Sequence, residues 1–136
     1  VKENDTIDLD NQITIEVVHA EHGYIPPMKQ SGGKVIENIG YIIDDKDTRI
    51  YITSDTICFE NEYKCDILCV PVSDYGVVMG AFEASLLAKA TNAKLVIPLH
   101  ADSPAYPINY DFLKEMFEKN EVEYEIFENE ESIEIE

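Results

Sequence analysis

Three side chains able to bind metal ions stand at the ends of separate strand-like runs in this sequence. They are His22, Asp55 and His100, and they are 33 and 45 residues apart. Imidazole nitrogens and carboxylate oxygens together suit zinc, and also iron or manganese, and a carboxylate can bridge two ions. Because functional groups are commonly presented where a strand gives way to a loop, the pattern is compatible with a metal site built from these three residues, although the spacing alone favours surface or capping roles.

The same residues allow simpler interpretations. Asp55 stands between Ser54 and Thr56, and a strand that ends in these residue types forms an Asx or ST turn more often than a catalytic centre. A histidine at the end of a strand can also cap that strand or lie at the surface. His19 competes with His22 for the first ligand position, because both follow the same apolar run.

The first half of the chain is predicted to form four strands. Period-two alternation of apolar and polar residues indicates them, with a loop at 19–23 that carries His22 and an Asp-rich turn at 44–47. Asp55 follows the fourth of these strands. Their expected ranges are 5–9, 13–18, 35–43 and 49–53.

The second half predicts a strand, helix, strand unit that delivers His100. Its strands are apolar runs typical of strands buried on both faces, and its helix carries apolar residues at helical spacing. The expected ranges are 67–70, 79–91 and 93–99. The remaining elements are an amphipathic helix at 110–119 and two closing strands at 122–127 and 133–135, joined at Asn129-Glu130.

Composition fits one domain over residues 1–136 and narrows its partners. A chain of this length can bury roughly two thirds of its unfolded surface. Its formal net charge of −18 argues against nucleic acid as a partner. With no apolar run of about 20 residues and no signal-peptide pattern, we expect no membrane partner and a cytoplasmic location. Cys58, Cys65 and Cys69 include no CxxC pair and are expected to be reduced thiols.

Several segments of the chain follow one another in a characteristic order. Residues 15–22 end in Ala-Glu-His, residues 40–43 and 49–56 form a hairpin ending in Ser-Asp-Thr, and residues 66–72, 79–84 and 93–100 lead to His100. Together with Asn129-Glu130 before Ile133, they resemble the metallo-β-lactamase-fold hydrolases. The resemblance is closest to the branch of small metal-dependent hydrolases that includes ascorbate-6-phosphate lactonase-like proteins. The hairpin is similar to the one that ends in the family's Gly-Asp-Thr motif.

This resemblance implies a fold and a set of roles. The fold would be an α/β (α+β) arrangement, a mixed sheet with two main helices that forms the C-terminal half of an αββα sandwich. His22 would bind the first metal, Asp55 would bridge both metals as the catalytic residue, and His100 would bind the second. His22 is preferred to His19 because Ala20-Glu21-His22 fits the family's pattern. Two Zn²⁺ ions, or Mn²⁺ or Fe²⁺, would promote hydrolysis of an ester, lactone or phosphodiester in a small-molecule substrate.

Two departures from the family pattern bear on activity. Ser54 replaces the usual glycine before the bridging aspartate, which crowds a tight turn. The family's His-x-His-x-Asp-His motif does not occur in this sequence, and the chain starts at Val1 and not at Met. We therefore expect the C-terminal half of a hydrolase, inactive by itself, which pairs with the missing N-terminal half or forms a homo-oligomer.

Other interpretations stay open at this point. The chain could be a non-catalytic half-domain that serves as an assembly module. A flavodoxin-like doubly wound domain is the third alternative, although the antiparallel hairpins and the lack of a phosphate-binding glycine loop oppose it. Cys58 is interpreted as a buried structural thiol. Loop residues beside the ligands could contact substrate, namely Tyr24, Asp74, Tyr75, Asp102 and Tyr106.

Overall fold

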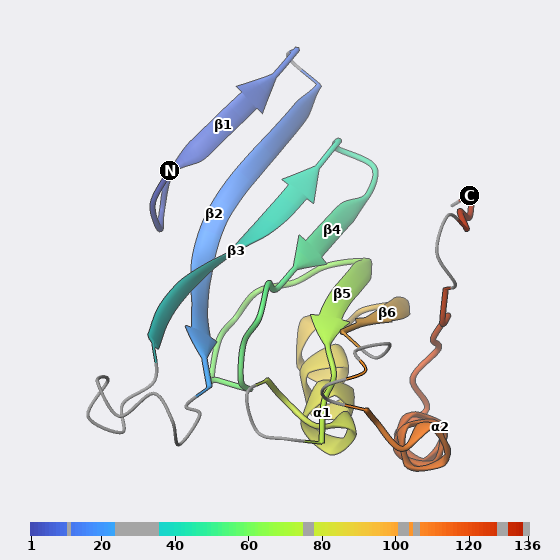
Figure 1. Cartoon of the computed structure of the whole chain (residues 1–136). Coiled ribbons are helices and arrows are strands. Elements are labelled where there is room, and N and C mark those ends of the chain that lie inside the picture. Colours follow the sequence, from blue (N-terminus) through green and yellow to red (C-terminus); the bar gives the residue numbers. More distant parts are fainter. Residues whose placement is uncertain are drawn as a thin grey trace.

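The fold was analysed in a computed structural model, which describes residues 1–10, 12–23, 36–74, 78–100, 104, 107–127 and 131–134. Within these ranges, six strands form one sheet in the order in which they occur in the chain, and two helices pack against it (Figure 1). The elements are β1 (Thr6–Leu9), β2 (Ile13–His22), β3 (Ile36–Asp44), β4 (Arg49–Ile52), β5 (Ile67–Pro71), α1 (Ala81–Thr91), β6 (Leu95–Leu99) and α2 (Tyr110–Lys119).

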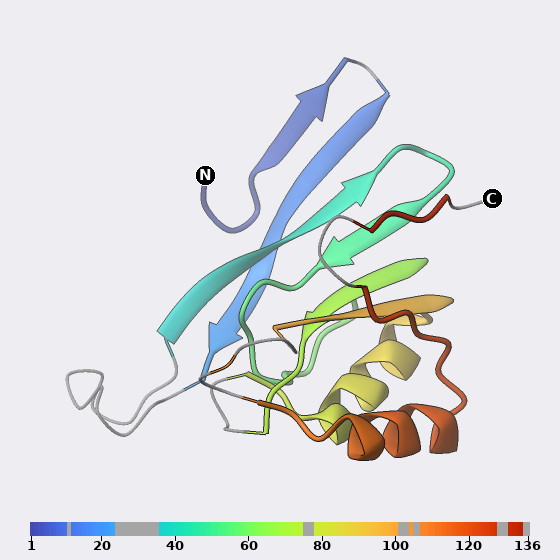
Figure 2. The same cartoon turned by 45° about the vertical axis from the view of Figure 1, so that its right-hand side comes forward.

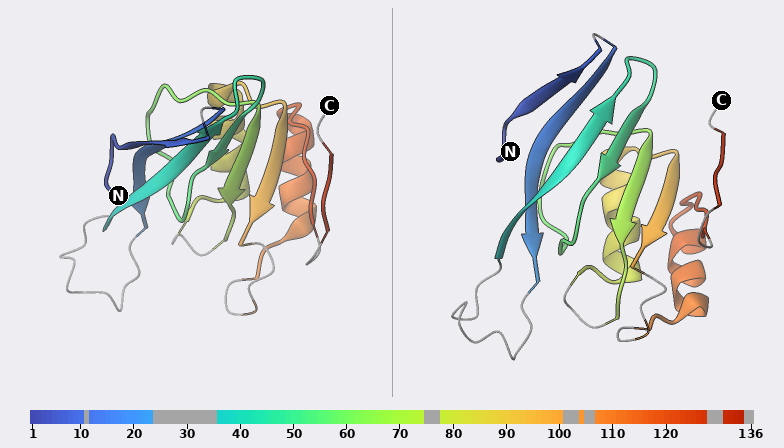
Figure 3. Two further views of the ribbon diagram at one scale, coloured as in Figure 1. Left: turned by 90° about the horizontal axis from the view of Figure 1, so that it is seen from above. Right: turned by 45° about the horizontal axis from the view of Figure 1, so that its top comes forward.

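The sheet is mixed, and its strand directions place several strand ends together. β1 to β4 pair antiparallel, whereas β4, β5 and β6 pair parallel. Consequently β2, β4, β5 and β6 run in the same direction and end at the same edge of the sheet, as the right-hand view of Figure 3 shows. The predicted mixed sheet with two main helices is confirmed.

One face of the sheet forms the hydrophobic core with the helices. The register aligns Ile42, Tyr51, Leu68 and Val96 on this face, and all four are at most 1% exposed. The same core cluster contains Leu113, Met116 and Phe117 of α2, and Ala84, Leu87 and Ala88 of α1. Figure 2 shows both helices beside the part of the sheet formed by β4 to β6, with no helix beside the β1–β2 hairpin.

The opposite face of the sheet is apolar as well. Its register aligns Val17, Tyr41, Ile52, Cys69 and Ile97 in one row across five strands. The β1–β2 hairpin turns its own apolar residues to this side, and Leu9 and Ile13 remain 44% and 37% exposed. A sheet that is apolar on both faces has the pattern of an internal layer, covered on both sides.

At the edge where β4 and β6 begin, Asp66 joins the two strands. Its Oδ2 accepts a hydrogen bond from the backbone N–H of Arg49 at 2.9 Å, and its Oδ1 lies 2.9 Å from the Nζ of Lys94. These two contacts, the backbone hydrogen bond first, hold the pKa of the Asp66 carboxyl below its usual value. Asp66 therefore links the starts of β4 and β6 at the edge opposite to the predicted ligands, mainly through its hydrogen bond to Arg49 N–H, because the Lys94 side chain is 80% exposed.

Three predicted elements differ from the structure. Residues 19–22 are not a loop, because β2 pairs with β3 residue by residue as far as His22 and Ile36. α1 begins at Ala81 and not at residue 79, because Gly80 has extended φ and ψ angles and is the N-cap. None of the described residues in 122–127 and 131–134 belongs to a strand, and the predicted turn at Asn129-Glu130 lies outside the described residues.

The first predicted closing strand is reduced to a single bridge for a physical reason. Tyr124 forms a parallel bridge with Val96, whose N–H donates to Glu123 O and whose O accepts from Glu125 N–H. The next donor along β6 would be Pro98, which has no backbone N–H and cannot extend the ladder. Among the helices that the structure describes, none is long and apolar enough to cross a membrane.

Candidate metal centre

The three predicted ligands all lie at one edge of the sheet. His22 is the last residue of β2, Asp55 lies three residues after β4, and His100 directly follows β6. Because β2, β4 and β6 run in the same direction, the fold brings their ends to a common edge. β3 separates the first two of these strands and β5 the last two, so the neighbouring ligand strands are about 10 Å apart.

After β4, the chain crosses the helix-covered face of β3 over a glycine. A Cβ atom added to Gly40 would lie 2.9 Å from the carbonyl oxygens of both Ile52 and Thr53, so the backbone can pass this closely only where no side chain stands. Two residues before Gly40 on β3, Asn38 donates a hydrogen bond from Nδ2 to the backbone oxygen of Asp55 at 2.9 Å. The crossing therefore carries Asp55 toward β2.

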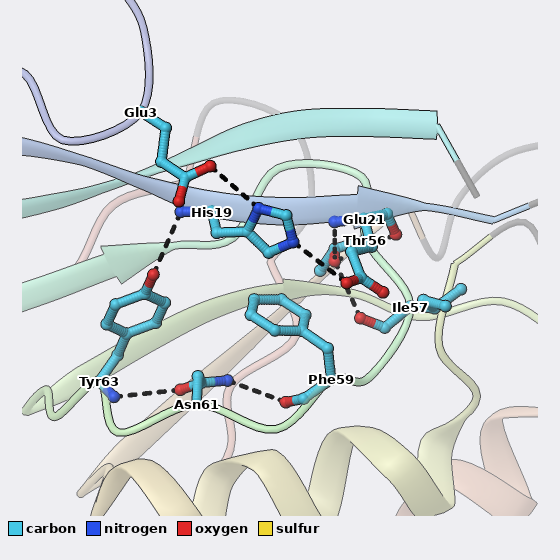
Figure 4. Close-up of polar contacts among 8 residues, drawn as sticks. All are labelled: Glu3, His19, Glu21, Thr56, Ile57, Phe59, Asn61 and Tyr63. Atoms are coloured by element: carbon cyan, nitrogen blue, oxygen red, sulfur yellow. Dashed lines mark hydrogen bonds and ion pairs between the residues drawn. The ribbon is translucent and has the colours of Figure 1, made fainter. Parts of the chain in front are cut away.

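Hydrogen bonds then join the Asp55 turn to the end of β2 (Figure 4). The backbone N–H of Glu21 donates to Thr56 Oγ1 at 2.9 Å, and the backbone N–H of Ile57 donates to Glu21 O at 2.7 Å. Glu21 directly precedes His22, and Thr56 directly follows Asp55. Covalent geometry therefore limits the separation between the Cα atoms of His22 and Asp55 to roughly 14 Å.

The His22 ring is held in a tautomer suited to metal binding. Its Nδ1 lies 2.9 Å from the carbonyl oxygen of Gly23. Because a carbonyl only accepts, Nδ1 carries the proton in this bond, and Nε2 of the neutral ring keeps its lone pair. A backbone carbonyl that orients the second ring nitrogen in this way is common for metal-binding histidines.

The rival histidine, His19, is engaged differently. Its Nδ1 lies 3.1 Å from Glu3 Oε2, and its Nε2 lies 3.1 Å from Glu21 Oε1 (Figure 4). The hydrogen bond to Glu21, followed by the one to Glu3, raises the pKa of His19. Because both ring nitrogens of His19 already contact carboxylates, the geometry favours His22 as the ligand on this strand.

Two of the residues at this edge adopt left-handed backbone conformations. Ser54 has a φ of 58° and His100 a φ of 66°. Ser54 therefore has the conformation for which the family's glycine is suited, at a cost of roughly 1 to 2 kcal/mol relative to a right-handed residue. Strain of this kind is retained where the surrounding structure determines it and concentrates at functional sites.

The donor set fits zinc in kind and falls short in number. Two imidazoles and one carboxylate are suitable ligands. Among the residues that the structure describes, however, no three His, Cys, Asp or Glu side chains are grouped closely enough to hold an ion. The assignment of His22, Asp55 and His100 as metal ligands, with Asp55 as the catalytic bridge, therefore stays a prediction.

An open cavity of about 450 Å³ lies beside the same edge. It is lined by Ile57, Cys58, Ser73, Asp74, Val78, Met79, Gly80 and Glu83. Asp74 Oδ2 accepts a hydrogen bond from the backbone N–H of Asn109, which caps α2, at 2.9 Å. Tyr24, Tyr75, Asp102 and Tyr106, the other predicted substrate contacts, lie outside the described residues.

Cys58, Cys65 and Cys69 are free thiols, as expected from the sequence. Burial, with a smaller contribution from the charge of Glu83, raises the pKa of the Cys58 thiol. Burial raises the pKa of Cys69 to about 11. Cys58 is half-buried and lines the cavity, so it is not the fully buried thiol that was expected.

The residues that fix Asp55 against β2 were not identified from the sequence alone. Asn38 and Thr56 are ordinary residues in a strand and a loop, and Glu21 acts only through its backbone in the contact with Thr56. Gly40 carried a usable signal, because an isolated glycine inside a strand pattern often marks a close approach of another backbone segment. The sequence does not indicate which segment approaches.

A protein-family model described as a Beta-lactamase superfamily domain matches residues 1–100. This chain belongs to the metallo-β-lactamase superfamily. The match covers the six strands, α1 and all three predicted ligands. No curated protein matches the chain.

Several solved structures share this fold. Igni18, a metallo hydrolase from the archaeon Ignicoccus hospitalis, is 18% identical with a TM-score of 0.74, over 98% of this chain and 58% of its own. Isothiocyanate hydrolase from Delia radicum gut bacteria is 20% identical with a TM-score of 0.73, over 99% and 58%. A candidate zinc-dependent hydrolase from Thermotoga maritima is 19% identical with a TM-score of 0.65, over 86% and 58%. The chain thus spans a little over half the length of these proteins.

Proposed function

We propose that this chain supplies one half of a metal-dependent hydrolase, in which His22, Asp55 and His100 bind two zinc ions. The observation that carries the proposal is the common sheet edge reached by β2, β4 and β6, with the Asp55 turn hydrogen-bonded to the end of β2. Membership of the superfamily supports it. The substrate would be a small molecule with an ester, lactone or phosphodiester bond.

Each residue has a defined part in this proposal. Bound zinc ions supply a water of lowered pKa and polarise the oxygen that is under attack. His22 offers Nε2 because Gly23 O holds its Nδ1 proton. Asp55 would bridge the ions, and Asn38 holds its backbone in place. Mn²⁺ or Fe²⁺ would suit the same donors.

Three ligands shared between two ions leave each ion with too few donors, because zinc in proteins usually takes four ligands. The chain alone is therefore proposed to bind zinc weakly and to be inactive. The apolar sheet face opposite the helices supports pairing with a second layer, which would complete the sandwich and supply further ligands. By this proposal the partner is the family's N-terminal half and the setting is cytoplasmic.

A second candidate function rests on the same apolar face. A half-domain with exposed Leu9 and Ile13 could serve as an assembly module through a homodimer that covers this surface. The net charge of −18 on each copy opposes such self-association. Light scattering separates the two proposals, since a monomer with no tendency to dimerise counts against the assembly module.

The test of the hydrolase proposal compares two histidines on one strand. Zinc affinity, measured by competition with a chromophoric chelator, should fall for His22→Ala and for Asp55→Asn. His19→Gln is the matched control, three residues away on β2, and should leave zinc affinity unchanged. An unchanged affinity in His22→Ala, or a loss in His19→Gln, would contradict the ligand assignment. Stoichiometric zinc with normal turnover of a lactone or phosphodiester by the chain alone would contradict its proposed inactivity.

A further inference from the structure

We propose that Thr56 is a positioning residue of the metal centre, whose buried hydroxyl fixes the Asp55 turn against the strand that carries His22. This inference rests on the proposed function, because it concerns the same pair of ligands. Thr56 is fully buried, with 0% exposure. It does not contact the metal in this scheme and acts through its neighbours in the chain.

The hydroxyl takes the place of a missing strand partner. β1 pairs with β2 only as far as Glu16, and two further backbone bonds reach Val17. Beyond Val17, the outer edge of β2 is met by the loop that follows β4. Tyr63 Oη accepts from the N–H of His19 at 3.2 Å, and Thr56 Oγ1 accepts from the N–H of Glu21 at 2.9 Å (Figure 4).

Thr56 is itself held on several sides. Its Oγ1 lies 2.8 Å from Ile57 O and 3.2 Å from Glu21 O, so the hydroxyl proton has a carbonyl acceptor while the oxygen accepts from Glu21 N–H. The backbone oxygen of Thr56 accepts from the N–H of Met79, ahead of α1, at 3.0 Å. The hydroxyl is therefore a fixed point between the sheet and the segment that leads into the helix.

The position of this hydrogen bond links it to the ligands. Glu21 and His22 are adjacent, as are Thr56 and Asp55, so this bond helps to set the separation of the two ligand-bearing segments, together with the bond from Ile57 N–H to Glu21 O. Loss of the hydroxyl leaves the N–H of Glu21 without its acceptor and weakens the attachment of the turn to β2. Residues that hold metal ligands in place typically cost 10- to 100-fold in metal affinity when they are changed.

Thr53 offers a matched control on the same loop. It is also 0% exposed, and its hydroxyl donates to the backbone oxygen of Ser54 at 2.8 Å, one residue away. Thr53→Val and Thr56→Val thus remove the same atom from equally buried sites. Only the second removes a bond between the two ligand-bearing segments.

The experiment measures zinc affinity and amide hydrogen exchange in the full chain. Thr56→Val is expected to lower zinc affinity by about 10- to 100-fold and to speed exchange at Glu21. Thr56→Ser should restore both, and Thr53→Val should keep wild-type zinc affinity. Thr56→Ala replaces the valine variant if that variant does not fold.

Two outcomes overturn the inference, and they are distinguishable. If His22→Ala lowers zinc affinity while Thr56→Val binds zinc as tightly as Thr53→Val, the positioning role is wrong and the hydrolase proposal stands. If neither His22→Ala nor Thr56→Val changes zinc affinity, the metal site itself is wrong, and the role of Thr56 falls with it.

Discussion

Replacing Gly40 with alanine tests the crossing that delivers Asp55 to β2. The new Cβ would stand 2.9 Å from two backbone oxygens and 3.1 Å from the carbonyl carbon of Thr53. Because these are backbone atoms, relief requires a shift of several tenths of an ångström in the segment that follows β4. Overpacking of this kind costs about 1 to 3 kcal/mol, whereas alanine in a strand gains about 0.5 to 1 kcal/mol over glycine. We expect a net loss of roughly 1 kcal/mol, the difference between the middle values of these two ranges.

The assay is the free energy of unfolding from urea denaturation, with Gly80→Ala as the matched control. A Cβ at Gly80 would meet Glu83 Oε2 at 2.9 Å, and its next neighbour is at 3.8 Å. The carboxylate end of Glu83 can rotate away, so any loss in Gly80→Ala reports the lower preference of alanine for the N-cap position and not overpacking against backbone. Equal stability of Gly40→Ala and the wild type would refute the close crossing.

Three further predictions follow from single residues. Ser54→Gly should raise the free energy of unfolding by about 1 kcal/mol, because φ is 58° there; an unchanged value would contradict the strain. Tyr51→Phe should stabilise by about 1 kcal/mol in thermal unfolding, because the buried hydroxyl has no hydrogen-bond partner within the described residues; a large loss would reveal a partner. His19 has a folded-state pKa raised above 6.5, so its stabilisation is complete below pH 6.5 and is lost as pH rises through the folded pKa. His19→Gln should remove this pH dependence, which is below about 1 kcal/mol because the pair is partly exposed.

Local patterns located the six strands of the sheet and both helices, although not every boundary, because their signal lies within a few neighbouring residues. Alternation located β1 to β4, and helical spacing located α2 with its observed bounds. Such patterns do not show which strand a segment pairs with, or whether that strand can extend the pairing. The segment around Tyr124 alternates like a strand, yet Pro98 on the neighbouring β6 limits it to one bridge.

The candidate site also has some features that local patterns indicate and others that depend on the tertiary fold. His22, Asp55 and His100 were predicted from their residue types and from their positions at the ends of strands. The structure places all three at one edge of the sheet because β2, β4 and β6 run in the same direction. The choice of His22 over His19 gains support from contacts with Glu3 and Gly23 that no local pattern encodes. The roles of Gly40 and Thr56 depend on a chain crossing, and a crossing is a property of the tertiary fold.

By our proposal, a further layer would complete two features of the fold. The first is the sheet face opposite the helices, which carries Tyr41, Ile52 and Ile97 and continues onto the apolar side of the β1–β2 hairpin. The second is the proposed metal donor set, to which the layer would add ligands at the edge of that same sheet. One layer packed on this face would bury the apolar row and extend to the ligand edge, so a single partner meets both requirements. We therefore expect added partner to raise zinc affinity and protect β3 amides from exchange together, and a gain in one without the other would separate the two requirements.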